Sequence, residues 1–321
     1  MKFLILCDPD GTNSARLIKD YGIDPKQIWV WDYIETHQFL LHALSQHLGF
    51  NLIQDIEKVN MKFDKILSNP PYDNGMYVQF LKLLPNLLKE DGQFQFLVPN
   101  KILIPFTKGA TYAKHNLRVD KIDLRHGEAF VGAIEGTWVC NVIGGIGKTD
   151  QFDLILPDGT ELKTDFDSPN SVMEMSLTDF NLHRKIMRKD NKLIAHTDGP
   201  INSEFFVYIR PTPKRVNNKL CYHGVANEYG EDMKSGRYQI CKTAEQAERM
   251  LKIYTESELF RYISFCNFGF TMINRFTWEF FPNIEDCAYD TEQDVYDFFN
   301  VTQEEIEHIQ KILQKPRNKH H

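Results

Sequence analysis

The chain has 321 residues, of which 42% are hydrophobic and 12% aromatic, and its formal net charge is −7. This length allows one large domain or two ordinary ones, and the hydrophobic content excludes global disorder. No stretch approaches the roughly 20 consecutive apolar residues of a membrane span, and the chain does not open on a signal-peptide pattern. The six cysteines are scattered without a Cys-x-x-Cys pair. We therefore expect a cytoplasmic protein with reduced thiols and no structural zinc.

The first 147 residues alternate short apolar runs with amphipathic stretches, as in an α/β protein. Helical crossovers between apolar runs join parallel strands. The last runs follow each other without a long helix, which fits an antiparallel edge. We expect a mostly parallel sheet of seven strands, at residues 3–7, 28–31, 51–54, 65–67, 94–98, 121–124 and 138–143.

Helical spacing marks segments in both halves of the chain. Residues 243–262 and 302–313 each have apolar positions three and four apart, and Thr302 with Glu305 forms a capping signal. A further helix is expected at 36–48. The side chains that lie near one face of it are Phe39, Leu40, Ala43, Leu44 and His47.

The texture of the sequence changes after residue 147. Residues 151–164 predict a hairpin, because Asp158-Gly159 supplies the positive φ angles of a tight turn. We therefore expect two domains: a catalytic α/β domain over 1–150 and an α+β domain over 151–315 that ends in an acidic helical tail.

Charge is segregated within the second half. Residues 183–219 hold nine Lys or Arg against three acids, whereas 281–310 hold nine acids and no Lys or Arg. Two interpretations stay open: two solvated faces of opposite sign, or a basic surface for phosphates with an acidic element facing away from it.

The most informative stretch is Asn69-Pro70-Pro71-Tyr72, which directly follows an apolar strand. In an open parallel sheet, ligands bind where strands end. The two prolines remove backbone donors and stiffen the loop, so the carbonyl groups of Asn69 and Pro70 are available as acceptors. Two fixed acceptors can bind both hydrogens of an exocyclic amine and draw its nitrogen toward a tetrahedral, nucleophilic geometry. Tyr72 offers a flat face to a base.

With this loop the chain resembles the N6-adenine DNA methyltransferases in which the cofactor motif comes first and the target-recognition region is C-terminal. The likeness is clear over 1–147 and weaker to about residue 315. It implies a Rossmann-like S-adenosylmethionine-dependent domain, Asn69, Pro70, Pro71 and Tyr72 as catalytic residues, and a target adenine flipped out of the duplex. It also implies double-stranded DNA as partner, together with a cognate restriction endonuclease where the enzyme belongs to a restriction-modification system.

The resemblance also implies a cofactor site for S-adenosylmethionine. Asp8, Gly11 and Thr12 correspond to the family's first turn, although Asn13 stands where a second Gly is usual. Asn tolerates positive φ, which keeps the match. Relatives of this order carry a segment before the first strand that closes over the methionine end of the cofactor; here the sequence opens at that strand.

The next two strands carry the other cofactor residues that the resemblance implies. Asp32 corresponds to the acid that accepts both ribose hydroxyls. Asp55 corresponds to the acid that receives the cofactor's adenine amine, and Ile56 to the apolar residue that packs on that ring. Pro71 lies at the junction of the cofactor and target sites.

Substrate residues are expected further along the chain. Phe130 corresponds to the family's second stacking face for the flipped base. Arg210, Lys214 and Arg215 are candidates for contacts with DNA, because arginine suits guanine edges and phosphates while lysine mainly neutralises charge.

Three alternatives stay open. An RNA adenine methyltransferase solves the same amine problem, as does an enzyme that methylates a glutamine amide in a protein, although the long C-terminal region favours a polymeric target over a protein loop. A nucleic-acid-binding relative with a degenerate cofactor site is the non-catalytic alternative. No acids or histidines have metal-ligand spacing, which argues against a metal-dependent nuclease. The sequence does not indicate the target sequence or the oligomeric state.

Overall fold

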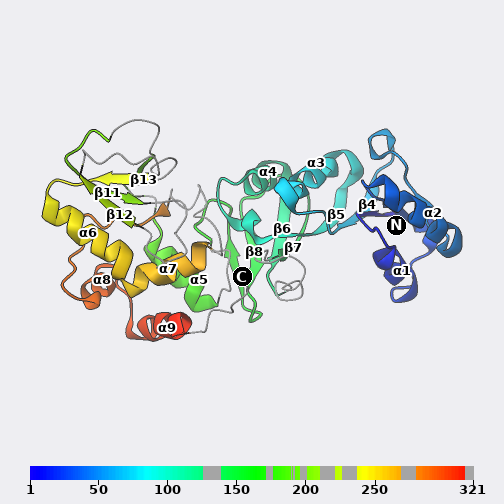
Figure 1. The fold of residues 1–321 in the computed structure, drawn as a ribbon. Coiled ribbons are helices and arrows are strands. Elements are labelled where there is room, and N and C mark those ends of the chain that lie inside the picture. The colour runs from blue at the N-terminus through cyan, green and yellow to red at the C-terminus, as the bar shows by residue number, and fades with distance from the viewer. Residues whose placement is uncertain are drawn as a thin grey trace. The chain divides into compact units, whose positions relative to one another are not determined.

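The computed structural model describes residues 1–125, 139–170, 176–188, 190, 192–195, 201–209, 221–225, 237–268 and 280–314. The chain divides into two compact units, Met1–Asp167 and Ser168–His321, which we call unit 1 and unit 2. Figure 1 shows the elements of both. None of the helices in the described ranges is long and apolar enough to cross a membrane.

Unit 1 is built on a nine-stranded sheet of order β3-β2-β1-β4-β5-β7-β6-β8-β9. Strands β1 to β5 are parallel to one another, and β7 runs antiparallel between β5 and β6. The expected fold class, a Rossmann-like α/β domain with a mostly parallel sheet, is confirmed, and all seven expected strands are present. The strands are β1 Phe3–Leu6, β2 Ile28–Trp31, β3 Asn51–Leu52, β4 Phe63–Ser68, β5 Leu88–Pro99, β6 Leu117–Asp123, β7 Val139–Ile146, β8 Phe152–Ile155 and β9 Glu161–Thr164.

The last two strands of this sheet correct the expected sheet size and domain boundary. Strands β8 and β9 form the predicted hairpin, but β8 pairs in parallel with β6 and so extends the first sheet. The sheet therefore has nine strands rather than seven, and the units divide after Asp167 rather than at 150. The physical reason is burial: Phe152 and Leu154 are fully covered within this unit.

Helix α2 shows which apolar residues face the sheet. Leu41 is fully buried and Leu44 and Leu48 pack on the same cluster as Phe3 and Val30. Of the five side chains that the sequence places near one face, Phe39 is 85% exposed, Leu40, Ala43 and His47 are also exposed, and only Leu44 is partly buried. The helices of unit 1 are α1 Thr12–Lys19, α2 Glu35–Leu48, α3 Tyr77–Leu87 and α4 Lys108–Asn116, with short 3-10 turns η1 Pro25–Gln27, η2 Ile56–Lys58, η3 Asp73–Gly75 and η4 Asn100–Leu103.

The parallel pairing brings the carboxyl ends of the strands to one edge of the sheet. Leu6, the last residue of β1, is level with Trp31 of β2 and with Ser68 of β4. The hydroxyl of Ser68 donates to the carbonyl of Leu6 at 3.0 Å and ties β4 to β1 at this point. The segments that follow these strands therefore emerge side by side. We call this border the carboxyl edge.

Unit 2 contains a four-stranded antiparallel sheet of order β10-β13-β11-β12, with α6 packed on β11 and β12 (Figure 1). The segment expected as one helix at 243–262 is two, because the chain is extended at Ser257 between α6 and α7. Its elements are α5 Leu177–Ile186, β10 Ile194–Ala195, β11 Phe205–Ile209, β12 Cys221–Val225, β13 Arg237–Ile240, α6 Ala244–Glu256, α7 Glu258–Phe268, α8 Glu292–Phe298 and α9 Gln303–Gln314.

Helix α9 begins as the sequence indicates. The hydroxyl of Thr302 accepts from the backbone N–H of Glu305 at 3.3 Å, and the carboxylate of Glu305 accepts from the backbone N–H of Thr302 at 2.8 Å. Glu305 also pairs with Lys185 of α5 at 2.6 Å. The first acidic turn of α9 thus both caps its own helix and neutralises a cation of the basic segment.

Candidate active site

The Asn-Pro-Pro-Tyr loop leaves β4 at the carboxyl edge. Asn69 is exposed, Pro70 is buried, and Pro71 and Tyr72 are half-buried. The phenol of Tyr72 donates to the side-chain oxygen of Asn69 at 2.6 Å. In this arrangement the amide oxygen is the acceptor, and the bond uses one of the two lone pairs on that oxygen. The other lone pair can accept a further hydrogen.

The pKa of Tyr72 is shifted in the direction that preserves this bond. Burial, with a smaller contribution from the Cys140 thiol, raises the pKa of Tyr72 to about 12. Because a phenol donates only while it is protonated, the donor to Asn69 persists throughout the neutral range. The sequence does not reveal this contact directly, although a Tyr three residues after an Asn is within reach of it.

The turn after β1 is organised by Asp8, which is completely buried. Its carboxylate accepts from the backbone N–H groups of Asn13 and Ser14, each at 2.9 Å, and from the Ser14 hydroxyl. The N–H of Thr12 is bound by Asp10 at 3.0 Å. The first backbone donors of α1 are therefore already satisfied inside the turn. Asp8 shapes the turn, and the surfaces left for a ligand are the exposed side chains of Thr12 and Asn13.

Gly11 is required by this turn for two reasons. Its φ is +69°, and a Cβ at this position would lie 2.7 Å from the side chain of Leu44 on α2. The close approach is thus to a helix of the same unit. Asn13 lies within α1, so the Asn that replaces a second Gly adopts ordinary helical geometry and needs no positive φ. Cys7 has a φ of +61°, which is unusual for a residue with a side chain.

Asp32 follows β2 directly and is 3% exposed. Its Oδ1 accepts from the backbone N–H of Ile34 at 2.9 Å and contacts Nδ1 of His37 at 3.0 Å. Within the described residues nothing donates to Oδ2. The Asp32 carbonyl accepts from Gln38 Nε2 at 2.7 Å, and the buried Oε1 of the same Gln38 amide has no partner among those residues. His37 and Gln38 were not singled out from the sequence; their distance of five and six residues from Asp32, on the first turn of a helix, is the available signal.

Asp55 and Ile56 stand at the end of β3, on the next strand along the edge. Asp55 caps η2 by accepting from the N–H of Glu57 at 3.0 Å, and its other oxygen pairs with Lys58 at 2.8 Å. The hydrogen bond from Lys58 and that from Glu57 lower the pKa of Asp55, so the group is ionised at neutral pH. Its side chain is 42% exposed, whereas Ile56 is buried.

The residues expected to contact the substrate lie outside the described residues: Phe130, Arg210, Lys214 and Arg215. Of the basic segment 183–219, the described cations include Lys185, paired with Glu305, and Lys192, paired with Glu285. The acids of the C-terminal segment therefore neutralise cations upstream of them. An unpaired basic surface, if the chain has one, depends on other members of that segment.

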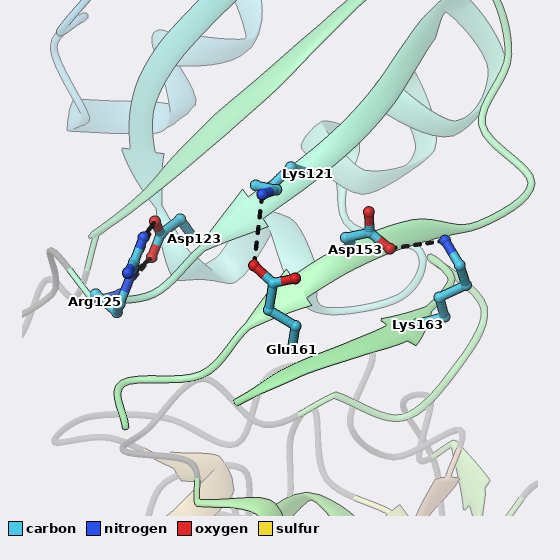
Figure 2. A network of polar contacts seen from close by, with 6 residues as sticks. All are labelled: Lys121, Asp123, Arg125, Asp153, Glu161 and Lys163. Atoms are coloured by element: carbon cyan, nitrogen blue, oxygen red, sulfur yellow. Dashed lines mark hydrogen bonds and ion pairs between the residues drawn. The ribbon is translucent and has the colours of Figure 1, made fainter. Parts of the chain in front are cut away.

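A second charged region in unit 1 is electrically balanced. Figure 2 shows three ion pairs on and beside β6, β8 and β9. Lys121 faces Glu161 at 3.6 Å, Lys163 faces Asp153 at 2.7 Å, and Arg125 holds Asp123 at 2.6 Å. Each cation is matched by an acid, so these strands do not form the positive surface that phosphates require. Within the described residues no group of three or more His, Cys, Asp or Glu could hold a metal ion.

No family model and no curated protein matches this sequence. Among solved structures, it is similar to a chain of a type I restriction-modification system, with 16% identity, a TM-score of 0.38, and coverage of 57% of this chain and 45% of that one. The methyltransferase subunit of a type I system from Streptococcus thermophilus gives 13% identity, a TM-score of 0.34, and coverage of 48% and 42%.

A predicted O-methyltransferase from Agrobacterium tumefaciens gives 12% identity, a TM-score of 0.37, and coverage of 48% of this chain and 78% of that one. The chain spans less than half the length of the two restriction-modification proteins. At such identities and scores we base no functional step on these likenesses and rely on the residues of the carboxyl edge.

Proposed function

We propose that this chain transfers a methyl group from S-adenosylmethionine to the N6 amine of adenine in DNA. One observation carries the proposal. The Asn69-Pro70-Pro71-Tyr72 loop emerges at the carboxyl edge one strand away from the turn of Asp8, and that turn is one strand away from Asp32. A rigid pair of amine acceptors and a buried acid with an unused oxygen thus share one border of an α/β sheet.

The residues at this border fit the cofactor. Asp32 would accept from the ribose through Oδ2, because Oδ1 already holds Ile34 and His37. The unpartnered Oε1 of Gln38 beside it is a second buried group that a polar ligand would satisfy. Thr12 would flank the methionine part, and Ile56 would pack on the adenine ring, with Asp55 sharing its carboxylate between Lys58 and the ring amine. When bound, S-adenosylmethionine supplies an electrophilic methyl group.

The loop prepares the amine for attack. Asn69 and Pro70 accept its two hydrogens, which withdraws the nitrogen lone pair from conjugation with the ring. The bond from Tyr72 holds the Asn69 amide with its oxygen as the acceptor. Pro71 fixes the distance between the target and the methyl donor by stiffening the loop. Asn69 therefore acts most strongly on the transition state, in which the nitrogen becomes tetrahedral.

Unit 2 is proposed to recognise the DNA, with Arg210, Lys214 and Arg215 in contact with phosphates or base edges. Phe130, which belongs to unit 1, would stack on the flipped base. Lys185 and Lys192 are not included, because each is paired with an acid of the C-terminal segment. A cognate restriction endonuclease is the partner that we expect in a restriction-modification system.

The experiment is methyl transfer from labelled S-adenosylmethionine to DNA and to RNA of equal sequence, with mass spectrometry of the hydrolysed nucleosides. Sequencing of host-cell DNA for N6-methyladenine gives the target site. The proposal expects N6-methyladenine in DNA. Product only in RNA would replace the DNA proposal with the RNA alternative. No binding of S-adenosylhomocysteine by calorimetry, together with no methyl transfer, would favour the nucleic-acid-binding relative with a degenerate cofactor site.

A further inference from the structure

The side-chain amide of Asn100, at the carboxyl edge, makes no hydrogen bond with any described residue. This residue is the first of η4, directly after β5, and it is 5% exposed. Its Oδ1 is buried without a hydrogen-bond partner, and no described residue bonds to its NH2 group. Because amide nitrogen and oxygen are assigned from their hydrogen bonds, either atom could occupy the inner position.

An amide in this condition is energetically unfavourable. A buried polar group without a partner costs about 1–3 kcal/mol, and native proteins satisfy the large majority of such groups. If the protein gained nothing from the amide at position 100, an apolar side chain of similar size would be more favourable there. The missing partner is therefore expected to come from outside the chain.

The position of Asn100 says which ligand could reach it. Strand β5 is the neighbour of β4, which leads into the Asn-Pro-Pro-Tyr loop, with Phe96 level with Ser68. Cys140 of β7 pairs with Val98, two residues before Asn100. Burial is the largest cause of the raised pKa values of Tyr72 and Tyr77, and the Cys140 thiol is the next largest. Both rings therefore lie near this end of β5.

A second contact links η4 to the loop side of the sheet. The ammonium of Lys101, the residue after Asn100, lies 5.8 Å from the centre of the Tyr77 ring at the start of α3. Helix α3 follows the Asn-Pro-Pro-Tyr loop after the single turn η3. Asn100 thus directly follows the strand next to the loop. It lies between Val98, which pairs with Cys140, and Lys101, which approaches the Tyr77 ring.

We propose that Asn100 is a specificity-determining residue that binds the edge of the acceptor base. This inference rests on the proposed function and deepens it. The amide NH2 donates to the ring nitrogen beside the target amine, and the amide oxygen shares one amine hydrogen with the acceptors of the Asn-Pro-Pro-Tyr loop in a three-centre hydrogen bond. Adenine presents a ring acceptor and an amine donor side by side, which matches the two halves of an Asn amide. Guanine carries a carbonyl oxygen at the place of the amine, so both halves would not be satisfied.

The first measurement does not depend on methyl transfer. Binding of deoxyadenosine monophosphate and of its 1-deaza and 7-deaza analogues is followed by NMR titration, with S-adenosylhomocysteine saturating the cofactor site. The wild type is expected to bind one of the two analogues about tenfold more weakly than the natural nucleotide, the size of one hydrogen bond. In Asn100→Ala and in Asn100→Asp, which keeps the shape but loses the donors, that difference should vanish.

The second measurement is methyl transfer to the duplex that sequencing identifies, using the same variants. For Asn100→Ala the expected result is a fall in kcat/KM of about tenfold or more with an unchanged or higher thermal midpoint, because the lost amide made no bond with the described residues. Asn100→Asp should lower kcat/KM as well, but it buries a charge, so its thermal midpoint is not used to judge a structural role. Asn60→Ala, an exposed Asn on the same unit, is the matched control. A lower thermal midpoint with unchanged kcat/KM would show a structural amide.

The outcomes separate this inference from the proposed function. Equal binding of all three nucleotides by the wild type, or an analogue effect that persists in both variants, overturns the role of Asn100 even if DNA is methylated. An ordered water as the amide's partner predicts that result. Absence of methyl transfer by the wild type contradicts the proposed function, while an analogue effect that is lost in the variants still supports the base contact.

Discussion

Asp32 and Asn100 at the carboxyl edge of unit 1 differ from Asp179 of unit 2 in how many of their side-chain hydrogen bonds are made within the described chain. Asp32 uses one oxygen for Ile34 and His37, and its other oxygen accepts nothing from the described residues. The Asn100 amide has no partner there at all. Asp179 of α5, equally buried, accepts four bonds: from Tyr262, from His308, and from the N–H and hydroxyl of Ser176.

The ion pairs of unit 2 follow the pattern of Asp179. Glu285 is bound by Lys192 and faces Lys242 at 3.4 Å, and Lys185 is bound by Glu305. A saturated buried acid organises the fold: Asp179 closes the capping box of its own helix with Ser176, and it joins α5 to α7 and α9 through Tyr262 and His308. An unsaturated one at the end of a parallel strand is arranged for a ligand. The comparison predicts that substitutions in unit 2 lower stability, whereas those at the carboxyl edge lower binding or rate.

The largest expected effect on stability is that of Asp179→Ala. Loss of this carboxylate leaves the Tyr262 phenol, the His308 ring and the Ser176 groups without their acceptor in a buried site, so we expect the free energy of unfolding to fall by about 3 kcal/mol. Hydrogen exchange by mass spectrometry should show the loss in α5, α7 and α9. Asp190→Ala, at an exposed position of the same unit, is the control. Normal protection of these helices would contradict the structural role.

The hydrogen bonds of Asp179 also make the stability of the fold depend on pH. Burial alone would raise the pKa of Asp179, but the hydrogen bonds from Tyr262, Ser176 and His308 outweigh it and the pKa is lowered. A lowered folded-state pKa means that this stabilisation is present above the ordinary pKa of about 4 and is lost as pH falls through the folded value. Unfolding of the wild type should become easier below about pH 4, and Asp179→Ala should lack that component.

The largest expected effect on rate is that of Asn69→Ala. The side-chain oxygen of Asn69 meets the amine most strongly as the nitrogen becomes tetrahedral, so methyl transfer should fall by roughly 100-fold or more. Calorimetry should give nearly unchanged affinity for S-adenosylmethionine, because this amide is held by Tyr72 and faces the target. Asn60→Ala serves again as the control. Near-full activity of Asn69→Ala would remove its catalytic assignment.

The sequence predicts the features that depend on local patterns and not those that depend on packing between distant parts of the chain. The strands were predictable because apolar runs between amphipathic stretches mark a covered parallel sheet, and Asp32 and Asn69 follow from their places directly after such runs. The sequence does not indicate which apolar residues of α2 are buried, because Phe39 and Leu40 are as apolar as Leu41 and Leu48. Only packing against the sheet decides between them.

Two features of the site required the folded chain. The hairpin of β8 and β9 was recognisable from its turn, but its pairing partner β6 lies about 30 residues away, and nothing local indicates which sheet it joins. An Asn after a strand reads as an ordinary turn residue, so Asn100 was not singled out. That its amide lacks a partner is a property of every neighbour packed around it, and no sequence pattern expresses it.

A smaller effect is expected for Asp32→Ala. Loss of the ribose acceptor should weaken S-adenosylmethionine binding by about 1.5–3 kcal/mol, the usual worth of hydrogen bonds to a charged group, which is roughly 10- to 150-fold in Kd. Calorimetry with S-adenosylhomocysteine measures it. The thermal midpoint measured without ligand checks that the loss of affinity does not come mainly from the lost bonds to Ile34 and His37. Unchanged affinity would assign the ribose to another acid, for which Glu35 is the nearest candidate in sequence.

The smallest effect comes from an exception to the comparison. Gln239 of β13 in unit 2 is 2% exposed, and neither atom of its amide has a hydrogen-bond partner in the described residues. It differs from Asn100 in location, since it is paired with the fully buried Val207 of β11 in the middle of the antiparallel sheet. Opposed residues of an antiparallel pair share a face, so Gln239 lies on the face of the sheet that builds the core.

Val207, opposite Gln239, belongs to the hydrophobic core of unit 2, so this amide is packed on a core face and does not lie at the end of a parallel strand. Gln239→Leu should therefore raise the free energy of unfolding by about 1 kcal/mol, because an apolar side chain of similar volume replaces an unsatisfied polar one. Chemical denaturation measures it, and methyl transfer and DNA binding should not change. The matched substitution Asn100→Leu should instead reduce methyl transfer without lowering stability. If Gln239→Leu weakened DNA binding and left stability unchanged, the amide would belong to a recognition surface. An unpartnered buried amide would then mark a ligand-binding site in both units.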